Sequence, residues 1–293
     1  MNPKVSILIP CLNEEAFIEG VLDSLQQQEF PSGQLEILLI DGGSTDRTRK
    51  IIRDYQQRHS NIRLLENPAR FVPQAMNIGI REAKGEIIIR MDAHAAYPPE
   101  YVRVLVDWLE RSGAENVGGV WRIEPRSDHP KARAIADILA HPLGVGNSLF
   151  RIGVEEPQEV DTVPFGCYPR EVFEQYGLYD ERLQRNQDIE LNKRIRRKGG
   201  RILLVPDTYS VYYARDTFRG LWKNNFATGL WVPLTIFFTK AYDSLSLRHF
   251  VPAFFVVYVA LCFGLLGKWL LVGMDYTFEP LVYLPLCLYL LLV

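Results

Sequence analysis

The chain has 293 residues, of which 47% are apolar and 23% charged, so it is long enough for one large or two modest domains and is not a disordered tail. Its 33 basic and 35 acidic side chains give a net charge of −2, and no overall basic field favours a nucleic-acid partner. The four cysteines show no paired spacing. We therefore expect neither a disulfide framework nor a zinc site.

The first 120 residues alternate short apolar runs with amphipathic stretches of helical length. Strands are predicted at Val5–Pro10 and Leu35–Ile40, because continuous apolar runs between turn residues are typical of strands buried on both faces of a parallel sheet. Between them, Glu14–Gln28 carries apolar residues at helical spacing. The same alternation predicts a helix around 51–55, a strand at Ile62–Leu65, a helix at Val72–Ala83, a strand at Glu86–Met91 and a helix around 104–109. This order indicates an α/β domain with a mostly parallel central sheet.

The pattern is weaker from residue 113 to 161. It predicts a strand at 118–121, a helix at 131–140 and a flexible loop at Gly144–Asn147. Clearer elements follow: a strand at Val163–Pro169, a helix at Glu171–Tyr176, a helix at Asp188–Lys198 and a strand at Arg201–Val205.

The C-terminal part has a different composition. Phe218–Lys240 is rich in Trp and Phe but contains a proline, Pro233, and several polar residues, which favours an amphipathic segment lying on a membrane surface. Phe250–Gly267 is uncharged and, with Trp269–Met274, long enough to cross a bilayer, whereas the uncharged run Pro280–Val293 is short for a crossing. We therefore expect a catalytic domain at 1–215, an interfacial segment at 216–248 and a membrane region with one or two spans at 249–293.

The distribution of basic residues predicts the orientation of that region. Only Lys268 follows the first span, whereas five basic residues precede it: Arg215, Arg219, Lys223, Lys240 and Arg248. Positive charge is enriched on the cytoplasmic side of membrane spans. The large N-terminal part is therefore expected in the cytoplasm, on the inner membrane. Met1–Pro10 lacks the long apolar core of a signal peptide.

Polar groups follow three of the predicted parallel strands, at Pro10–Glu15, Asp41–Asp46 and Asp92–His94. Taken singly, such residues often do no more than cap the next helix. In an open α/β sheet, however, ligands bind at the carboxyl ends of the strands. Three such groups at successive strand ends therefore predict a ligand site.

Asp92 and His94 are two residues apart at a strand end, so their side chains are expected on the same face. A carboxylate and an imidazole can share a divalent cation, and this mixed set suits Mn²⁺ at least as well as Mg²⁺. For His94 a purely structural hydrogen bond is the alternative.

A fourth polar group, Gln187–Glu190, opens a predicted helix with a basic far side. Asp188 is either a helix cap or a general base that deprotonates an incoming hydroxyl.

Four segments in this order and spacing carry a resemblance to a known family: VSILIPCLNEE, LLIDGGSTDRT, AMNIGIREAKGEIIIRMDAH and VPFGCYPREVFEQYGLYDERLQRNQDIELNKRIRRKGGRI. They resemble family 2 glycosyltransferases of the GT-A fold. The likeness is strongest to the membrane-anchored, succinoglycan-type enzymes of bacterial exopolysaccharide synthesis, and it covers about residues 3–230.

The resemblance implies roles at the donor site. Pro10, Asn13 and Glu14 match positions that line the nucleotide pocket, and Asp41 matches the residue that contacts the uracil and ribose. Arg70 falls in the stretch that borders the donor's phosphates.

The resemblance also implies a metal site and a base. Asp92 matches the first residue of the Asp-x-Asp metal motif, with His94 in place of the second Asp. Asp188 matches the catalytic base of a Glu-Asp motif, with Gln187 in place of the Glu. The Gln-x-x-Arg-Trp motif of processive relatives is not present as such around Phe218–Trp222.

Together these features predict an inverting glycosyltransferase that uses Mn²⁺ or Mg²⁺. It would move a sugar from a nucleotide-sugar, with a UDP-sugar expected, to a lipid-linked or polysaccharide acceptor at the membrane. Two alternatives stay open. One is a polyprenyl-phosphate sugar synthase, whose phosphate acceptor needs no base. The other is a donor-binding but inactive membrane subunit, because His94 and Gln187 depart from the family pattern.

Overall fold

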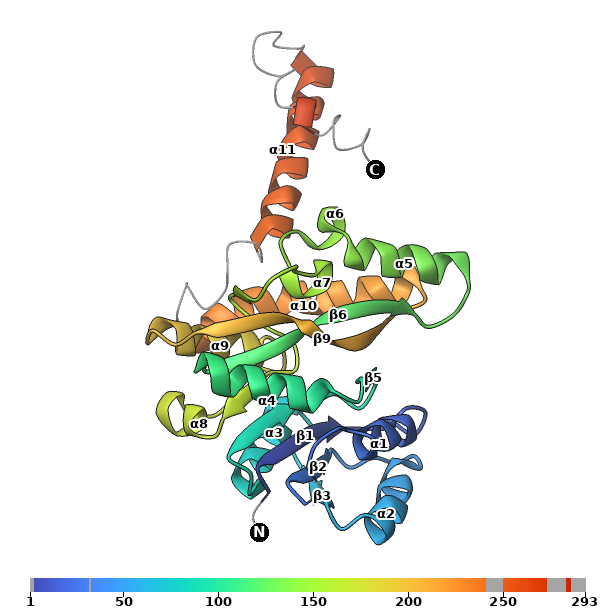
Figure 1. Cartoon of the computed structure of the whole chain (residues 1–293). Helices are drawn as coiled ribbons and strands as arrows, with labels where there is room; N and C mark the ends of the chain where they lie inside the picture. Colours follow the sequence, from blue (N-terminus) through green and yellow to red (C-terminus); the bar gives the residue numbers. More distant parts are fainter. Residues whose placement is uncertain (1–2, 32, 241–249, 273–282, 286–293) are drawn as a thin grey trace. The chain divides into compact units, whose positions relative to one another are not determined.

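The computed structural model describes residues 3–31, 33–240, 250–272 and 283–285, and it divides the chain into two compact units, Met1–Leu245 and Ser246–Val293 (Figure 1). The first half of unit 1 contains β1 (Val5–Cys11), α1 (Ile18–Gln26), β2 (Leu35–Asp41), α2 (Thr48–Arg58), β3 (Ile62–Glu66), α3 (Val72–Glu82), β4 (Ile87–Arg90), β5 (Ala95–Ala96) and α4 (Tyr101–Ser112). The second half contains β6 (Asn116–Pro125), α5 (Pro130–Ala140), α6 (Pro142–Val145), α7 (Leu149–Ile152), β7 (Gln158–Glu159), β8 (Cys167–Pro169), α8 (Glu171–Tyr176), α9 (Gln187–Arg197), β9 (Ile202–Ala214) and α10 (Phe218–Thr239).

The strands form one mixed sheet in the order β3-β2-β1-β4-β8-β6-β9-β5, with β7 also paired to β9. The long pairings are parallel: β1 with β2 and β4, β2 with β3, and β6 with β9. The antiparallel pairings through β8, β5 and β7 are short. The prediction of an α/β domain with a mostly parallel sheet is confirmed.

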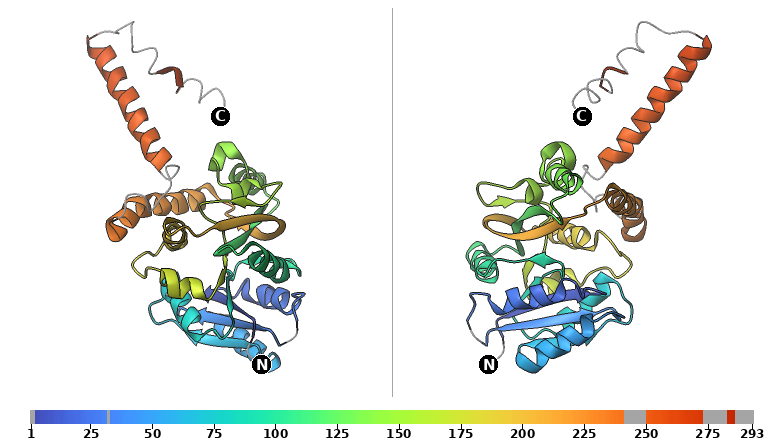
Figure 2. Two further views of the ribbon diagram at one scale, coloured as in Figure 1. Left: turned by 60° about the vertical axis from the view of Figure 1, so that its left-hand side comes forward. Right: turned by 90° about the vertical axis from the view of Figure 1, so that its right-hand side faces the viewer.

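Helices cover both faces of the sheet, which explains why its central strands are apolar throughout (Figure 2). Ile7 and Ile9 of β1 pack with residues of α1, α2 and α4. Leu8, which points to the opposite face, packs with residues of α3, α8 and α9. This packing brings the carboxyl ends of β1, β2 and β4 side by side, since β1 lies between the other two strands.

The strand predicted at Arg201–Val205 is much longer in the structure, because β9 continues to Ala214 beside β6. The register shifts between Gly119 and Val120 of β6, which accommodates the irregular stretch of β9 around Pro206. A Cβ atom at Gly119 would lie 2.7 Å from the Thr208 carbonyl oxygen, so the two strands approach closely only because this residue is a glycine.

Two smaller predictions were wrong. The loop predicted at Gly144–Asn147 is partly helical, since α6 ends at Val145 and the side chain of His141 accepts a hydrogen bond from the Leu143 N–H (3.2 Å). The strand predicted from Val163 begins only at Cys167, because Phe165 has a left-handed φ of 47°.

In unit 2, α11 (Val251–Val272) contains the window Val251–Lys268, with a mean hydropathy of 2.0. Within the described ranges this is the one helix long and apolar enough to cross a membrane. The second apolar run predicted at Pro280–Val293 lies outside the described residues except for 283–285.

Candidate active site

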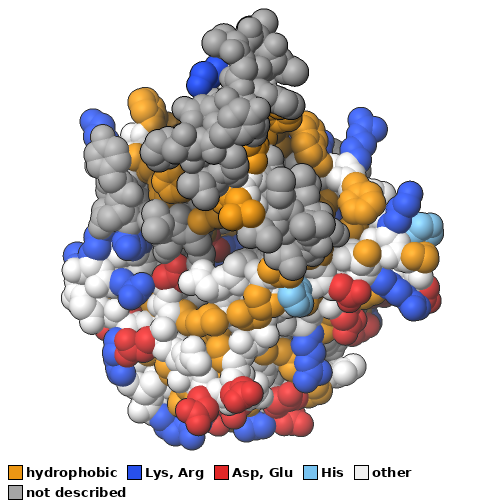
Figure 3. Space-filling model, turned by 90° about the horizontal axis from the view of Figure 1, so that it is seen from above, with side chains coloured by type: hydrophobic (Ala, Val, Ile, Leu, Met, Phe, Trp, Pro, Cys, Tyr) orange, Lys and Arg blue, Asp and Glu red, His pale blue; other side chains and the backbone are white. Residues whose placement is uncertain are grey.

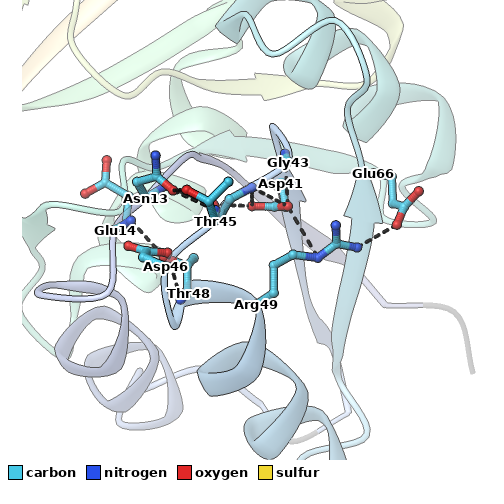
Figure 4. A network of polar contacts seen from close by, with 10 residues as sticks. Asn13, Glu14, Asp41, Gly43, Thr45, Asp46, Thr48, Arg49 and Glu66 are labelled. Atoms are coloured by element: carbon cyan, nitrogen blue, oxygen red, sulfur yellow. Dashed lines mark hydrogen bonds and ion pairs between the residues drawn. The ribbon is translucent and has the colours of Figure 1, made fainter.

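The loops after β1 and β2 are joined by reciprocal hydrogen bonds (Figure 4). The Asn13 N–H donates to Ser44 Oγ at 2.8 Å, and the Thr45 N–H donates to Asn13 Oδ1 at 2.8 Å. The Glu14 N–H donates to Thr48 Oγ1 at 2.8 Å. Asn13 adopts a left-handed φ of 57°, which Asn tolerates better than most residues.

Asp41 lies inside this loop pair and is 1% exposed. Its Oδ2 accepts from the Gly43 N–H at 3.0 Å and lies 3.6 Å from Arg49 Nε. Arg49 also contacts Glu66 at 2.6 Å, and this hydrogen bond raises the pKa of Arg49. In this structure Asp41 shapes the loop, and its carboxylate does not face solvent.

Glu14 and His94 connect the loop after β1 to the segment after β4. Glu14 Oε1 lies 3.2 Å from His94 Nδ1, and this hydrogen bond raises the pKa of His94. The His94 side chain remains 41% exposed. The structure thus brings together the polar groups that the sequence places after β1, β2 and β4.

Arg90, the last residue of β4, joins two of the predicted site residues. Its Nη2 donates to Asp92 Oδ1 at 3.2 Å, and its Nη1 lies 3.9 Å from Asp188 Oδ2. Burial lowers the pKa of Arg90, but the two carboxylates raise it by more, so it is held above its ordinary value. One guanidinium therefore holds Asp92 and Asp188 near a single point.

Asp188 lies in the first turn of α9 and its side chain is 36% exposed. It does not occupy the helix-cap position, which belongs to Asn186, a residue with a left-handed φ of 61°. Gln187 is buried. Asp188 Oδ1 nevertheless accepts a hydrogen bond from the Ile189 N–H at 2.9 Å, so the side chain also satisfies a backbone donor in the first turn of α9.

Two further predicted residues flank the site. Pro10 is the penultimate residue of β1 and pairs with Ile40 of β2. Arg70 has a left-handed φ of 69°, and its Cα would lie 3.3 Å from a Cβ atom at Gly42. The exposed Arg70 therefore borders the loop after β2. The roles predicted for Pro10, Asn13, Glu14, Asp41, Arg70, Asp92, His94 and Asp188 remain predictions.

Two arginines of the site, Arg90 and Arg49, were not predicted from the sequence. Arg90 had a detectable signal, because it is the single charge in the apolar run Ile87–Met91 and stands directly before the acidic segment. A charge in a strand buried on both faces requires a partner. Arg49 had no such signal, since a basic residue in the first turns of an amphipathic helix is ordinary.

The donor atoms near Asp92 suit a cation that is shared with a substrate. Within the described ranges, no group of three or more His, Cys, Asp or Glu side chains could hold a metal ion by itself. Asp92 and His94 offer one carboxylate and one imidazole. Mg²⁺ and similar ions are commonly held by one or two protein ligands together with substrate phosphates and water. The residues therefore fit a divalent cation that arrives with a diphosphate.

Comparison with known proteins gives the family. The sequence profile of Glycosyl transferase family 2 matches residues 6–177. The chain belongs to this family. It is 33% identical over 225 residues to the succinoglycan biosynthesis protein ExoA of Rhizobium meliloti, over 76% of this chain and 67% of that protein. It is 30% identical over 233 residues to a dolichyl N-acetyl-alpha-D-glucosaminyl phosphate 3-beta-D-2,3-diacetamido-2,3-dideoxy-beta-D-glucuronosyltransferase of Methanococcus voltae, over 77% and 71% of the two chains.

Solved structures give the fold. The mannosyltransferase PcManGT of Pyrobaculum calidifontis, in complex with GDP-Man and Mn²⁺, superposes with a TM-score of 0.66 at 23% identity, over 99% of this chain and 81% of that one. TarS of S. aureus with UDP-GlcNAc has a TM-score of 0.57 at 19% identity, over 72% and 59% of the two chains. This glycosyltransferase thus has the GT-A fold, as the resemblance in its sequence implied.

Proposed function

We propose that this glycosyltransferase moves a sugar, with inversion, from a nucleotide-sugar to a lipid-linked or polysaccharide acceptor at the cytoplasmic face of a membrane. The observation that carries the proposal is the Arg90 contact with both Asp92 and Asp188. A donor-side carboxylate and a candidate base thereby lie on either side of one guanidinium.

In the proposed reaction, the acceptor hydroxyl attacks the anomeric carbon from the face opposite the leaving diphosphate. Asp188 accepts the hydroxyl proton as the new bond forms, which its partial exposure permits. A divalent cation at Asp92 and His94 would supply Lewis-acid stabilisation of the charge on the diphosphate. The relative bound to GDP-Man and Mn²⁺ and the one bound to UDP-GlcNAc support a nucleotide-sugar donor.

The membrane part of the proposal is supported by α10 and α11. Phe218, Trp222 and Phe226 recur every fourth residue of α10, so they share one side of the helix, and they are 60%, 67% and 61% exposed. Large exposed apolar faces mark surfaces that contact a membrane or a partner. Arg219 and Lys223 lie next to them in the sequence and suit anionic lipid headgroups. Figure 3 shows one face of the molecule, where hydrophobic side chains lie among both basic and acidic side chains.

An Asp188→Asn variant tests the proposed chemistry. The purified full chain is incubated with labelled UDP- and GDP-sugars, Mn²⁺ and a membrane lipid extract, and sugar transfer into the lipid and polysaccharide fractions is measured. We expect transfer by Asp188→Asn to fall by about 10²- to 10⁴-fold, because the base is lost, while donor binding is retained. Glu174→Gln, which removes an exposed carboxylate on α8, is the matched control. Full turnover by Asp188→Asn would refute the assignment of the base.

The product distinguishes the alternatives. Sugar attached directly to a polyprenyl phosphate would indicate a polyprenyl-phosphate sugar synthase, whereas sugar attached to a saccharide hydroxyl with inverted configuration supports the proposal. Donor binding with neither transfer nor hydrolysis in the wild-type chain would indicate an inactive subunit.

A further inference from the structure

Two arginines, Arg185 and Arg215, have only neutral hydrogen-bond partners. Arg185 precedes α9, and its Nη1 donates to Asn224 Oδ1 and to Thr228 Oγ1, both at 3.2 Å. Arg215 follows β9, and its Nη1 donates to Tyr212 Oη at 3.4 Å. Both side chains are half-buried. In the part of the chain that the structure describes, neither guanidinium is paired with a carboxylate.

The electrostatic setting of this pair is unfavourable without an anion. Burial and the positive charge of Arg215 both lower the pKa of Arg185, and only Tyr212 acts in the opposite direction. Arg182, three residues earlier, shows the ordinary arrangement, since it lies 2.7 Å from Asp180 and its pKa is raised. Both side chains lie along α10: Arg215 Cδ would lie 3.4 Å from a Cβ atom at Gly220, and Arg185 Nη1 donates to Asn224, one helical turn further on. Two guanidinium groups placed along one helix without a counter-ion repel each other, and a bound phosphate group would relieve that repulsion.

The position of the pair separates it from the donor residues. Asp41 and Asp92 follow β2 and β4, whereas Arg185 is bonded to α10. Asn186, between Arg185 and α9, also reaches α10, because its Nδ2 donates to Thr235 Oγ1 at 3.1 Å. The pair thus lies where the start of the Asp188 helix meets the helix that carries the exposed aromatic face.

From this arrangement we infer that Arg185 and Arg215 form a binding site for the phosphate or diphosphate group of a lipid-linked acceptor. The inference rests on the proposed function and names the acceptor class. Two guanidinium groups provide the fork-shaped donors that match phosphate oxygens. With the phosphate held between α9 and α10, the lipid chain can leave along the exposed face of α10 and the sugar hydroxyl can reach Asp188.

Calorimetric binding without turnover tests the site. The full chain in detergent micelles is titrated with farnesyl diphosphate, with inorganic pyrophosphate, with farnesol, and with UDP or GDP in the presence of Mn²⁺. We expect Arg185→Gln and Arg215→Gln each to weaken farnesyl diphosphate binding by about tenfold to a hundredfold, the effect of losing hydrogen bonds between charged groups. The affinity for UDP and GDP should stay within about twofold of wild type, which calorimetry distinguishes from the loss of about tenfold or more expected for farnesyl diphosphate. Arg182→Gln, which removes a paired arginine, should change neither affinity.

Several results would overturn the inference. If both variants lose UDP or GDP binding in parallel, the arginines serve the donor diphosphate. If farnesol binds as tightly as farnesyl diphosphate, or both variants keep wild-type affinity for the diphosphate, the pair is not a phosphate site. Arg185→Lys, which keeps the charge, should recover part of the affinity, and thermal melting identifies any variant that fails to fold. A chain that binds farnesyl diphosphate through these arginines but transfers no sugar would refute the proposed function and leave this site standing.

Discussion

Replacing Arg90 by methionine tests whether one guanidinium positions both site carboxylates. The Arg90 side chain is 13% exposed, and it donates to Asp92 at 3.2 Å. A hydrogen bond between charged groups contributes about 1.5–3 kcal/mol. The longer contact to Asp188, at 3.9 Å and on a side chain more than a third exposed, adds less than about 1 kcal/mol. We therefore expect Arg90→Met to lower the free energy of unfolding by about 1.5–4 kcal/mol, or the Tm by roughly 3–15 °C.

The effect on catalysis separates positioning from simple stability. In Arg90→Met, the carboxylates of Asp92 and Asp188 lose the guanidinium that contacts both of them. A misplacement of about 1 Å at a reacting group lowers the rate by about a hundredfold. We expect kcat to fall by that order, while KM for the nucleotide-sugar changes far less. Arg90→Lys keeps the charge but loses the fork, so it should recover stability and leave kcat low. Initial rates and melting curves are measured on the same preparations.

Arg63 provides the matched control, since it also bridges two carboxylates, those of Glu36 at 3.6 Å and Glu82 at 2.9 Å, away from the site. Arg63→Met should lower the Tm and leave kcat unchanged. Wild-type kcat in Arg90→Met, or full recovery of kcat in Arg90→Lys, would show that Arg90 does not position the two carboxylates.

Three further predictions follow from other contacts. Gly119→Ala should lower the free energy of unfolding in urea by about 1–3 kcal/mol, because its Cβ atom would lie 2.7 Å from the Thr208 carbonyl oxygen. Gly20→Ala, with open space around the new methyl group, should instead raise the free energy of unfolding by about 0.5–1 kcal/mol. The hydrogen bond from Arg182 lowers the pKa of Asp180 in the folded chain. This hydrogen bond therefore stabilises the fold above the unfolded pKa of 3.8, and the stabilisation is lost as the pH falls through the lower folded pKa. Asp180→Asn should be up to about 1 kcal/mol less stable than wild type at pH 7 and should match wild type in thermal melts at acid pH. EDTA should weaken UDP or GDP binding by the wild-type chain and have no effect on Asp92→Asn, as measured by calorimetry.

The first half of the fold could be predicted because buried parallel strands are recognisable in the sequence as continuous apolar runs. The second half could not be predicted as fully. Pro206 and Asp207 interrupt β9 and end its apolar signal, and pairing resumes only because β6 shifts register at Gly119. A positive φ at Phe165 likewise cannot be inferred from a run of apolar letters. These features depend on contacts between segments far apart in the sequence.

The candidate site was likewise predicted from the sequence only in part. The positions of Asn13, Glu14 and Asp92 follow from the strands that precede them, since every parallel strand delivers its following loop to the same edge. The arginines do not follow in this way. The contact of Arg90 with Asp188 depends on how α9 packs, and the hydrogen bonds of Arg185 to Asn224 and Thr228 depend on how α10 packs. The sequence motifs predicted the acidic residues of the site, but which basic residues contact them depends on tertiary packing.

The pairing of charges distinguishes the arginines near the predicted donor residues from Arg185 and Arg215. Two arginines of the candidate site are engaged by carboxylates, Arg49 by Asp41 and Glu66, and Arg90 by Asp92 and Asp188, whereas Arg70 is exposed beside the loop after β2. In the proposed reaction, a divalent cation at Asp92 would supply further positive charge for a donor diphosphate at this site. Arg185 and Arg215 are not compensated in this way. They can hold an anion without a metal, which is the property required of a site that keeps an acceptor phosphate in place while donors are exchanged.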